Sequence, residues 1–444
     1  MPPQRVRAAD AQVALWDAAK ELAETPLLTR TWAFRLRGSV SEAALRSSVR
    51  KLGERHELLH AVFEEHDSEL ALRPVAAAPL RVETPGRVPT TDAELRAIAA
   101  TEARRPFQLD SEPLFRTVLF RLGEEDHLLV LTAHSLIWDR RTRDIVLKEL
   151  SELYASATTG RPPRLPEISK PYSEIAARIQ NAGADRRQAD FYWWLARLAS
   201  VRGMRLPADL DGSLGDVART GIARLHLGDP ADRPLAAALR EHRATPFALF
   251  AAALAGAVHC YTDESDMRVG TVIGNRLAVD SLRIVGPLSQ ATVLRFGIAT
   301  GMTFGALLHE VQRCTFEAFE HQSVPFIDVL LELEDHGVEP DMLAPLTVSD
   351  IGQGPVLSGW RGVTVAPVEI EFTEATSLAP GLDLAAHRTE TGYRLQLAYN
   401  ESLFSQSRAR AILRAVRDVA GRGLADPTAP VTALCDADQH RSAE

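Results

Sequence analysis

The residues with the clearest chemical potential lie in one short segment, residues 131–142 (LTAHSLIWDRRT). His134 carries an imidazole, whose unperturbed pKa of about 6.5 suits proton transfer near neutral pH. Ser135 carries a hydroxyl, which is no base at neutral pH and becomes a nucleophile only with a base beside it. Asp139 adds a carboxylate, but His134 and Asp139 together supply too few ligands for a metal. The segment therefore indicates acid–base or hydrogen-bonding chemistry.

The surrounding sequence predicts which elements must position this segment. Residues 114–121 and 127–132 are apolar stretches separated by a short turn, which favours two antiparallel strands. Residues 31–37 (TWAFRLR) alternate apolar and polar side chains, as a half-buried strand does. An amphipathic stretch at residues 143–155 predicts a helix. We therefore expect the chemical segment to lie at the end of a strand and before a helix.

A proline-rich stretch at residues 158–171 (TTGRPPRLPEISKP) separates two halves, since its four prolines forbid a continuous helix. We place a domain boundary there, with residues 1–165 in the first domain and residues 166–444 in the second. Both halves mix helix-like and strand-like stretches, which predicts an α+β fold with two lobes. In the second half, helices are expected at residues 185–198, 246–258, 304–319 and 405–422, and strands at 222–227, 267–273, 363–372 and 393–399.

Length and composition exclude several classes of protein. The chain has 444 residues, of which 45% are hydrophobic and 25% charged, as in ordinary globular proteins. A chain of this length can bury a large core without disulfides or metals. Acidic residues outnumber basic ones by 59 to 50, and the net charge of −9 argues against a nucleic-acid partner. Nearly all basic residues are arginine, and the four lysines are Lys20, Lys51, Lys148 and Lys170.

The cysteines and the termini carry information about the cellular compartment. Cys260, Cys314 and Cys435 lie far apart without CxxC spacing, so we expect neither a disulfide framework nor a zinc site. Residues 1–12 lack the apolar core of a signal peptide. The longest apolar run, residues 246–258, is shorter than the roughly 20 residues of a membrane span. We therefore expect a cytoplasmic protein in a reducing environment, with no membrane partner.

Seven segments, in chain order, resemble the condensation domains of nonribosomal peptide synthetases, which belong to the chloramphenicol acetyltransferase-like superfamily. In the first half of the chain, residues 9–16 resemble the family pattern SxAQxRLW, and residues 55–63 (RHELLHAVF) resemble RHExLRTxF. Residues 105–116 resemble PFDL…PLxR, and residues 190–198 resemble YWxxxL. In the second half, residues 269–276 (VGTVIGNR) resemble VGTPVANR, residues 286–295 resemble GFFVNTLxLR, and residues 321–330 resemble HQDLPFExLV. This chain departs from the patterns at His60, where the family has Arg, and at Gln290, where it has Asn.

The resemblance extends over nearly the whole chain and implies the architecture of that superfamily. Two chloramphenicol acetyltransferase-like lobes are then expected in a V-shaped pseudodimer with a central tunnel. Each lobe is expected to carry a mixed sheet flanked by helices. A segment of the second lobe near residues 343–360 is expected to cross to the first lobe, as the family's latch does.

The family's active-site motif is HHxxxDG, and this chain departs from it. When residues 131–140 are aligned with LTMHHxxxDG, His134 takes the first His and Ser135 takes the second. In the family, the second His lies near the reacting amine or hydroxyl. A serine can orient a nucleophile or hold a water there, and losing a general base costs roughly 10²–10⁴ in rate. Because a thioester is already activated, acyl transfer can survive that loss.

The resemblance also assigns roles around the two candidate catalytic residues, Ser135 and His134. His134 is expected to be structural, with an inherited catalytic role as the alternative. Asp139 takes the Asp of the motif and is expected to pair with Arg276, the Arg of the segment that resembles ANR. Breaking a buried pair costs about 3–5 kcal/mol, so this pair is expected to be a structural part of the active site.

Two bulky residues stand where smaller ones are usual. Arg140 takes the place of the motif's Gly, and an arginine disfavours the positive φ that a glycine allows. Its side chain is expected either to fill the substrate tunnel or to form, with Arg141, a cationic lip that binds a phosphate or a carboxylate. A solvated Arg at a helix start is the alternative. Trp138 either narrows the tunnel or belongs to the hydrophobic core.

The leading hypothesis is a stand-alone acyltransferase of natural-product biosynthesis. It would take an acyl group from the phosphopantetheine thioester of an acyl or peptidyl carrier protein bound in trans, or from coenzyme A. A small amine or alcohol would receive the group, forming an amide or an ester without a resident cofactor or metal. The alternative is a catalytically inactive binding module that recruits a tailoring enzyme or a carrier protein. A third hypothesis is a repurposed catalyst for cyclisation, epimerisation or elimination on a tethered intermediate.

Overall fold

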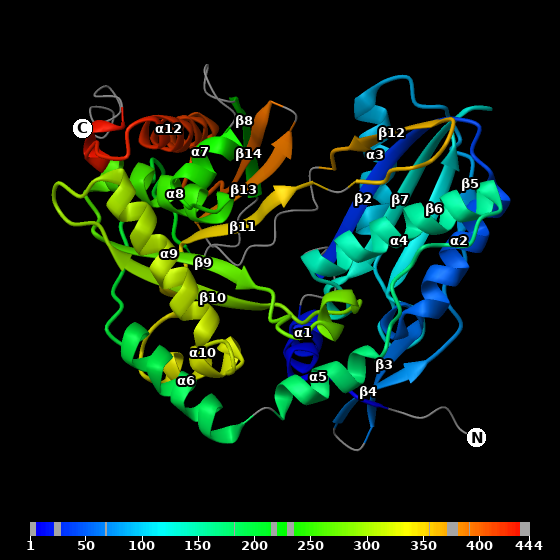
Figure 1. Ribbon diagram of the computed structural model, residues 1–444, viewed down its shortest axis with the longest axis horizontal. Helices are drawn as coiled ribbons and strands as arrows, with labels where there is room; N and C mark the ends of the chain where they lie inside the picture. Colours follow the sequence, from blue (N-terminus) through cyan, green and yellow to red (C-terminus); the bar gives the residue numbers. More distant parts are fainter. Residues whose placement is uncertain are drawn as a thin grey trace. The chain divides into compact units, whose positions relative to one another are not determined.

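The computed structural model describes residues 6–21, 28–66, 69–181, 183–214, 220–228, 235–354, 356–370, 381–389 and 391–435. The chain divides into two compact units, each with helices and sheets, so the fold class is α+β as expected (Figure 1). The first unit contains Met1–Ala182, Gly274–Ser289 and Pro355–Thr376. The second contains Gly183–Ile273, Gln290–Gly354 and Ser377–Glu444. This division differs from a single boundary after residue 165, since residues 166–182 and two later segments group with the first unit.

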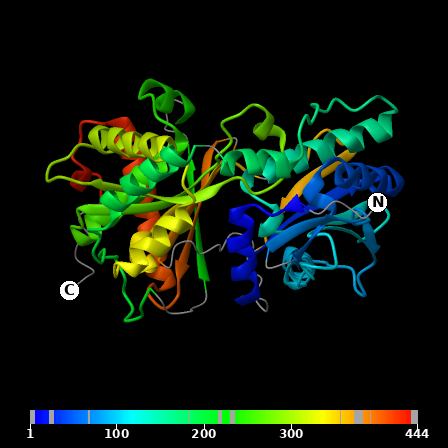
Figure 2. The ribbon, with the colours of Figure 1, turned by 90° about the horizontal axis from the view of Figure 1, so that it is seen from below.

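The first unit is built on a five-stranded sheet that carries the motif segment. Its strands, in spatial order, are β12 (Val363–Val368), β2 (Thr29–Gly38), β7 (Asp126–His134), β6 (Phe115–Arg121) and β5 (Arg81–Glu83). β7 runs antiparallel to β2 and to β6, and the β6–β7 pair is the one that the sequence predicts, whereas β5 runs parallel to β6. β12 pairs antiparallel with β2, from Val363 opposite Gly38 to Val368 opposite Ala33, and lies beside it in both ribbon views (Figures 1 and 2). The late chain thus supplies an edge strand, just beyond the expected crossing segment.

β7 is buried on both faces because helices pack against both sides of this sheet. Leu129 and Leu131 pack into a core cluster with α2 (Glu42–Arg55) and α4 (Arg140–Thr159). The alternate residues Leu128 and Val130 pack into a second cluster with α3 (Asp92–Arg104). This two-residue alternation of side-chain direction is the geometry of a pleated strand. The motif that follows β7 therefore starts from a rigid, fully covered element.

Smaller elements complete the first unit. A three-stranded sheet holds β1 (Val6–Arg7), β4 (Glu69–Pro74) and β3 (Ala61–His66). β3 and β4 form the antiparallel pair that the sequence predicts. The remaining helical elements are α1 (Asp10–Glu21), η2 (Glu57–His60), η3 (Ser135–Ile137), α5 (Tyr172–Gln180) and η4 (Asp280–Arg283).

The second unit is built on a six-stranded mixed sheet. Its strands, in spatial order, are β10 (Gln290–Gly297), β9 (Asp266–Ile273), β11 (Leu346–Gln353), β13 (Leu382–Thr389), β14 (Gly392–Asn400) and β8 (Thr220–Gly228). β11 runs parallel to both of its neighbours. The helices are α6 (Ala184–Leu198), α7 (Leu235–Glu241), α8 (Pro246–Thr262), α9 (Phe304–Glu320), α10 (Phe326–Asp335), α11 (Pro340–Leu343), α12 (Gln406–Ala425) and η5 (Val431–Ala433).

α8 is the buried helix that the apolar run predicts. The Thr245 hydroxyl accepts a hydrogen bond from the backbone N–H of Ala248 at 3.1 Å, and Pro246 occupies the first turn. Thr is a favourable N-cap, and Pro is tolerated in the first turn because its missing N–H has no intrahelical partner there. Residues from Ala248 to Cys260 are buried, so the helix forms the centre of the second unit's core.

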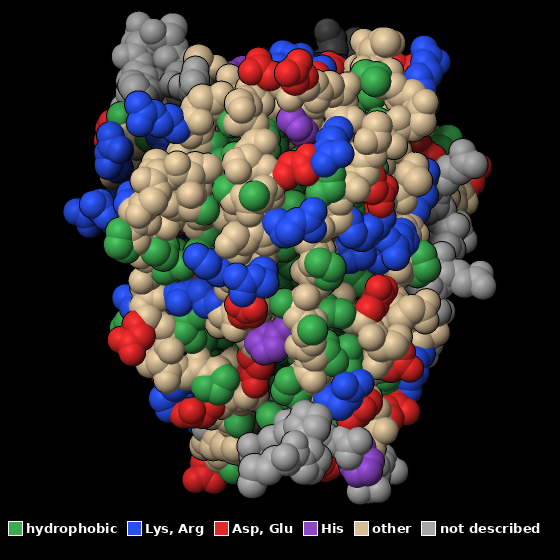
Figure 3. All heavy atoms as spheres, turned by 90° about the vertical axis from the view of Figure 1, so that its right-hand side faces the viewer, with side chains coloured by type: hydrophobic (Ala, Val, Ile, Leu, Met, Phe, Trp, Pro, Cys, Tyr) green, Lys and Arg blue, Asp and Glu red, His purple; other side chains and the backbone are tan. Residues whose placement is uncertain are grey.

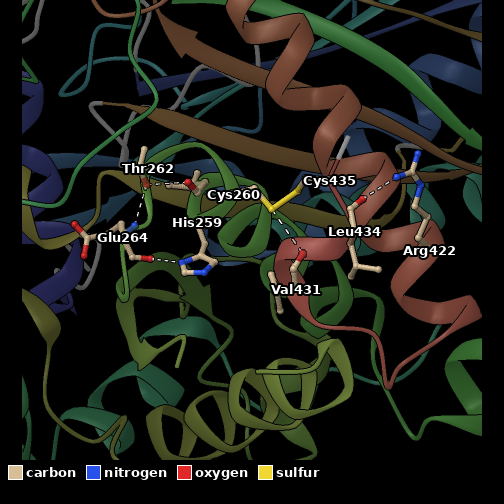
Figure 4. The surroundings of a disulfide bond; sticks show 9 residues. His259, Cys260, Thr262, Glu264, Arg422, Val431, Leu434 and Cys435 are labelled. Carbon is tan, nitrogen blue, oxygen red and sulfur yellow. Dashed lines mark hydrogen bonds between the residues drawn. A yellow bond between two sulfur atoms is a disulfide. The ribbon is translucent and has the colours of Figure 1, made fainter. Parts of the chain in front are cut away.

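The expectation of no disulfide is wrong. Cys260, near the end of α8, forms a disulfide with Cys435, which follows η5, with 6.5 Å between their Cα atoms (Figure 4). The two cysteines are 175 residues apart, so their spacing gives no signal. The fold brings them together because η5 packs beside α8, and the Val431 carbonyl lies 3.7 Å from Cys260 Sγ (Figure 4). Cys314 is free and buried.

Surface charge and helix composition bear on the classes of partner. On the face drawn in Figure 3, Lys and Arg side chains are interspersed with Asp and Glu. A mixed distribution of this kind lacks the single-sign footprint typical of nucleic-acid binding. Within the described ranges, no single helix has both the length and the apolar composition for a membrane crossing. α7 and α8, bent by 91°, meet that test only when taken together.

Candidate functional site

The motif segment leaves the first unit's sheet at the end of β7 and turns through η3 before α4 begins. Gln12 of α1 holds this turn, because its Nε2 donates to the Leu136 carbonyl at 2.8 Å. The same side chain accepts from the Ala9 N–H at 3.1 Å and is fully buried. Gln12 belongs to the segment that resembles SxAQxRLW, but its positioning role was not predicted. Gln12 thus fixes the backbone of the turn that carries the motif side chains.

His134 is held as a neutral ring. Its Nδ1 accepts a hydrogen bond from the Leu136 N–H at 3.2 Å, and because a backbone N–H only donates, the ring proton must lie on Nε2. The residue is buried, and burial, followed by the positive charge of Arg30, lowers the pKa of His134 to about 4. A Phe107 ring packs edge-on against the imidazole. His134 can therefore donate one hydrogen bond from Nε2, but it is unsuited to accept a proton near neutral pH.

This pKa predicts a specific dependence of stability on pH. Because the folded-state pKa of about 4 lies below the unfolded value of about 6.5, the unfolded state binds the proton first as the pH falls. The contribution is fully present above about pH 6.5 and is lost toward pH 4, to an extent of about 3 kcal/mol. Urea denaturation at pH 7 and pH 4.5 measures it.

The matched control for that measurement is His134→Gln, whose amide oxygen can still accept from the Leu136 N–H but does not titrate. Other acidic groups titrate equally in both proteins, so the difference between them isolates His134. We expect the variant to lose less stability between the two pH values than the unaltered protein. Equal losses would contradict the neutral, buried state of the ring.

Ser135 occupies the position of the family's second His and is also anchored. Its Oγ donates to the Leu28 carbonyl at 2.9 Å, and the residue is buried. Among the described residues, no imidazole or carboxylate accepts the Ser135 hydroxyl proton. A serine needs an adjacent base to become a nucleophile, so Ser135 is not activated in this way. Its oxygen lone pairs remain able to accept one hydrogen bond from an amine, a hydroxyl or a water.

The ion pair expected between Asp139 and Arg276 is present. Arg276 Nη2 lies 2.9 Å from Asp139 Oδ2, and both side chains are about 95% buried. The Asp139 carboxylate also caps α4, accepting from the Thr142 N–H at 2.7 Å. Arg276 donates further to the carbonyls of Ser281, Ile284 and Gly286. The pair thus fastens the Gly274–Ser289 segment to the start of α4 within the first unit.

The backbone before Arg276 supports this arrangement. Asn275 adopts a φ of +45°, in the left-handed region that Asn tolerates better than most residues.

Arg140, by contrast, adopts ordinary helical geometry in the first turn of α4. Arginine in the place of the family's Gly therefore causes no backbone strain here. Its side chain is exposed, and its expected role in a substrate tunnel stays a prediction.

Trp138 lies in the hydrophobic core of the first unit, which is the alternative left open by the sequence. Its ring stacks on Trp32 at a centroid distance of 4.9 Å and on Phe115 at 5.7 Å. Only 6% of the residue is exposed, so it offers little surface to a substrate. Aromatic packing of this kind stabilises the turn between β7 and α4. The assignment of Trp138 to a tunnel wall stays a prediction.

Several histidine and serine side chains of the second unit could take part in proton transfer, but each already has a hydrogen-bond partner. His321 Nδ1 lies 2.8 Å from Asp190 Oδ1, and Trp193 stacks on the ring at 4.1 Å. Ser349 Oγ donates to Asp383 Oδ2 at 2.9 Å. His259 Nδ1 lies 2.8 Å from the Glu264 carbonyl (Figure 4). No described group of three or more His, Cys, Asp or Glu side chains is arranged to hold a metal ion.

Comparisons with known proteins agree on one family. Residues 4–441 match the family described as Condensation domain. Cyclosporin synthetase of Tolypocladium inflatum is 27% identical over 417 residues, which cover 91% of this chain and 3% of that protein. Phosphinothricin tripeptide synthetase PhsC of Streptomyces viridochromogenes is 30% identical over 330 residues, which cover 71% of this chain and 30% of that protein. The chain therefore spans a small part of the curated relatives it matches.

Solved structures show the same fold. The X-domain from teicoplanin biosynthesis matches with a TM-score of 0.80 and 23% identity, covering 98% of both chains. A mutant starter condensation domain of rhizomide synthetase, in complex with C8-CoA, matches with a TM-score of 0.80 and 19% identity, covering 97% of both chains. Together with the match along almost the whole sequence, these findings identify the chain as a member of the condensation-domain family of nonribosomal peptide synthetases.

Proposed function

We propose that the chain is a binding module of a peptide assembly line, which holds a carrier-tethered intermediate and a tailoring enzyme without general-base acyl transfer. The state of Ser135 carries this proposal: its hydroxyl donates a hydrogen bond to the Leu28 carbonyl, and no described side chain that could act as a base accepts from it. His134 does not replace the missing base, because its Nδ1 is already an acceptor and burial keeps the ring neutral. The ordinary proton acceptor of the family is thus absent from both motif positions.

The comparisons support the two kinds of partner. The teicoplanin X-domain has been solved as a complex with OxyB, and that structure matches this chain with a TM-score of 0.78 and 23% identity. A tailoring enzyme is therefore our first proposed partner. The starter condensation domain bound to C8-CoA supports an acylated pantetheine thioester as the ligand class. The thioester arm would arrive with a carrier protein or CoA, so we propose no resident cofactor.

A substitution at Ser135 tests the proposal. We expect Ser135→Ala to bind a peptide-loaded carrier protein as tightly as the unaltered chain, to within about twofold, because a binding module needs no reactive hydroxyl. Fluorescence anisotropy with a labelled carrier measures the affinity, and mass spectrometry of the carrier arm detects any acyl transfer. Product formation by the unaltered chain that falls sharply in Ser135→Ala would contradict the proposal.

Acyl transfer is the second candidate function, favoured by the intact surroundings of the motif. The Asp139–Arg276 pair would hold the turn before α4 in place, and the lone pairs of Ser135 would still orient an amine beside an activated thioester. Under this candidate, Ser135→His restores the family's imidazole and raises the rate by roughly 10²–10⁴. Incubation of both proteins with acyl-loaded carrier and a panel of amines and alcohols distinguishes the candidates. No product from either protein would leave the binding module as the function.

A further inference from the structure

A cavity of about 840 Å³ lies within the first unit, and none of the motif residues 131–142 lines it. Its walls come from the end of α2, from η2, and from residues 165–172. The volume falls within the range of roughly 300–1,000 Å³ that is usual for small-molecule sites. The proposed function makes no use of this cavity, although its lining includes most of the residues 55–60 (RHELLH) that resemble a family motif.

His56 is a buried acceptor in the cavity wall. Its Nε2 lies 2.8 Å from Glu149 Oε2, and because an ionised carboxylate only accepts, this nitrogen carries the proton. Arg55 Nε donates to the same oxygen at 2.9 Å, which fixes the carboxylate. Only 3% of His56 is exposed, and no described residue bonds its Nδ1. Nδ1 is not one of the buried polar atoms that lack a partner, so it is accessible and can accept from a water or from a donor group of a ligand.

His60 supplies a second acceptor to the same cavity. Its Nδ1 lies 2.8 Å from the Gly53 carbonyl and 2.9 Å from the His56 carbonyl, so Nδ1 carries the proton. Nε2 of His60 is therefore an acceptor, at the position where the resembled motif has Arg. An arginine there could only donate, so the substitution changes the kind of ligand group that the cavity accepts.

Cationic groups line the cavity beside these acceptors. Two of the chain's four lysines, Lys51 and Lys170, are in its wall. Lys51 has no ion-pair partner among the described residues. Lys170 pairs with Glu174, four residues later on the surface, and an exposed pair of this kind is readily exchanged for another anion.

The glutamates in the cavity wall differ in whether their carboxylates already have hydrogen-bond partners in the protein. Glu54 is held by Arg50, at 3.0 Å, and Glu57 accepts from the N–H and hydroxyl of Ser173. Glu167 has no hydrogen-bond partner within the described ranges and lines the cavity. Glu167 can therefore accept a proton-bearing group of a ligand. The cavity combines ammonium donors with acceptors for a ligand hydroxyl.

We propose that this cavity is a binding site for a phosphate monoester. Its anionic oxygens would accept from Lys51 and Lys170. Because the second pKa is about 6, part of the ester keeps one O–H near pH 6.5, and this O–H would donate to His56, His60 or Glu167. The apolar group of the ester would contact the hydrophobic part of the wall, which includes Leu153, Leu165, Ile168, Ile284 and Val285. A sulfate ester has the same shape but no such proton near neutral pH, so it leaves the acceptors without a donor.

Lysine acetylation tests the site directly, because the chain has two lysines in the wall and two elsewhere. The full chain is acetylated with sulfosuccinimidyl acetate near pH 6.5, with phenyl phosphate or phenyl sulfate as the probe, and each lysine is followed by mass spectrometry. At about ten times its Kd, phenyl phosphate is expected to slow the reaction of Lys51 and Lys170 by about tenfold. Lys20 and Lys148 are expected to react at unchanged rates. Equal protection by phenyl sulfate, protection of all four lysines, or no protection would overturn the proposal.

Paired variants supply a second measurement. Lys51→Ala/Lys170→Ala is expected to weaken phenyl phosphate binding by about tenfold or more, as lost charge-assisted hydrogen bonds do. Lys20→Ala/Lys148→Ala removes the same total charge and is expected to leave the Kd unchanged. Glu167→Gln is expected to reduce the preference for phosphate over sulfate. Calorimetry measures all three, and equal effects of the two double variants would count against the site.

Discussion

Replacing Arg276 with leucine is expected to lower the free energy of unfolding by about 3–5 kcal/mol, one of the two largest effects we predict. Arg276 and Asp139 are both almost completely buried, with 2.9 Å between Nη2 and Oδ2. The substitution leaves the Asp139 carboxylate in the interior without its ion-pair partner. It also removes the donor from three backbone carbonyls between residues 281 and 286. Urea denaturation followed by circular dichroism measures the loss.

The same segment offers a matched control for Arg276→Leu. Asp280 pairs with Arg178 on the surface of the first unit, with 2.8 Å between Nη2 and Oδ1. We expect Asp280→Asn to change stability much less, because the Arg178 side chain is 46% exposed to solvent and the new amide oxygen can still accept from it. If Arg276→Leu were as mild as this control, the Asp139–Arg276 pair would not be the fastening that its burial indicates.

Removing the disulfide is expected to produce the second large effect. Cys260→Ser/Cys435→Ser should lower the free energy of unfolding of the second unit by about 5 kcal/mol, since the bond closes a loop of 175 residues in the unfolded chain. Differential scanning calorimetry of the variant, and of the unaltered chain with and without reductant, measures the change. The reduced chain and the double variant should agree, because both lack the same covalent constraint.

Thiol counting provides an independent control for the disulfide. In denaturant without reductant, the purified chain is expected to react with one equivalent of iodoacetamide, at Cys314. After reduction it is expected to react with three. Peptide mapping assigns each label, so partial oxidation cannot be mistaken for a different pairing. Three labels before reduction would show that Cys260 and Cys435 do not form the bond.

The elements around the candidate site could be predicted because their signals are local. The alternation in residues 31–37 and the apolar run of residues 127–132 correspond to β2 and β7, which are neighbours in the sheet. The side chains of Ser41 and Thr245 cap α2 and α8, and such capping depends only on a few adjacent residues. Elements with weaker local patterns, such as β11 and α10, were not predicted individually.

The long-range arrangement of the site could not be predicted from local patterns. The Asp139–Arg276 pair was expected only because each residue stands in a segment that resembles a family motif. Gln12, which holds the motif turn from α1, carries no periodic signal that points to Leu136. The disulfide between Cys260 and Cys435 depends on the packing of η5 beside α8, which is a property of the assembled core.

The sequence alone could not determine the protonation state of His134 or the environment of Trp138. The sequence allows His134 to be a base or a packed ring, and the acceptor role of Nδ1 together with burial decides for the neutral ring. Trp138 was compatible with a tunnel wall or a core position, and its stacking on Trp32 and Phe115 places it in the core. In both cases the deciding contacts are made with strands β2 and β6 or with the turn that follows β7.

The late position of β12 in the chain has a consequence for biosynthesis. Until the ribosome has translated Val368, β2 has no partner on one side, although the rest of its sheet is complete. An open strand edge is a template for pairing with other nascent chains. Truncated products that end before residue 363 should therefore be prone to aggregation, and chaperones that shield β-edges should matter most during synthesis of residues 135–368.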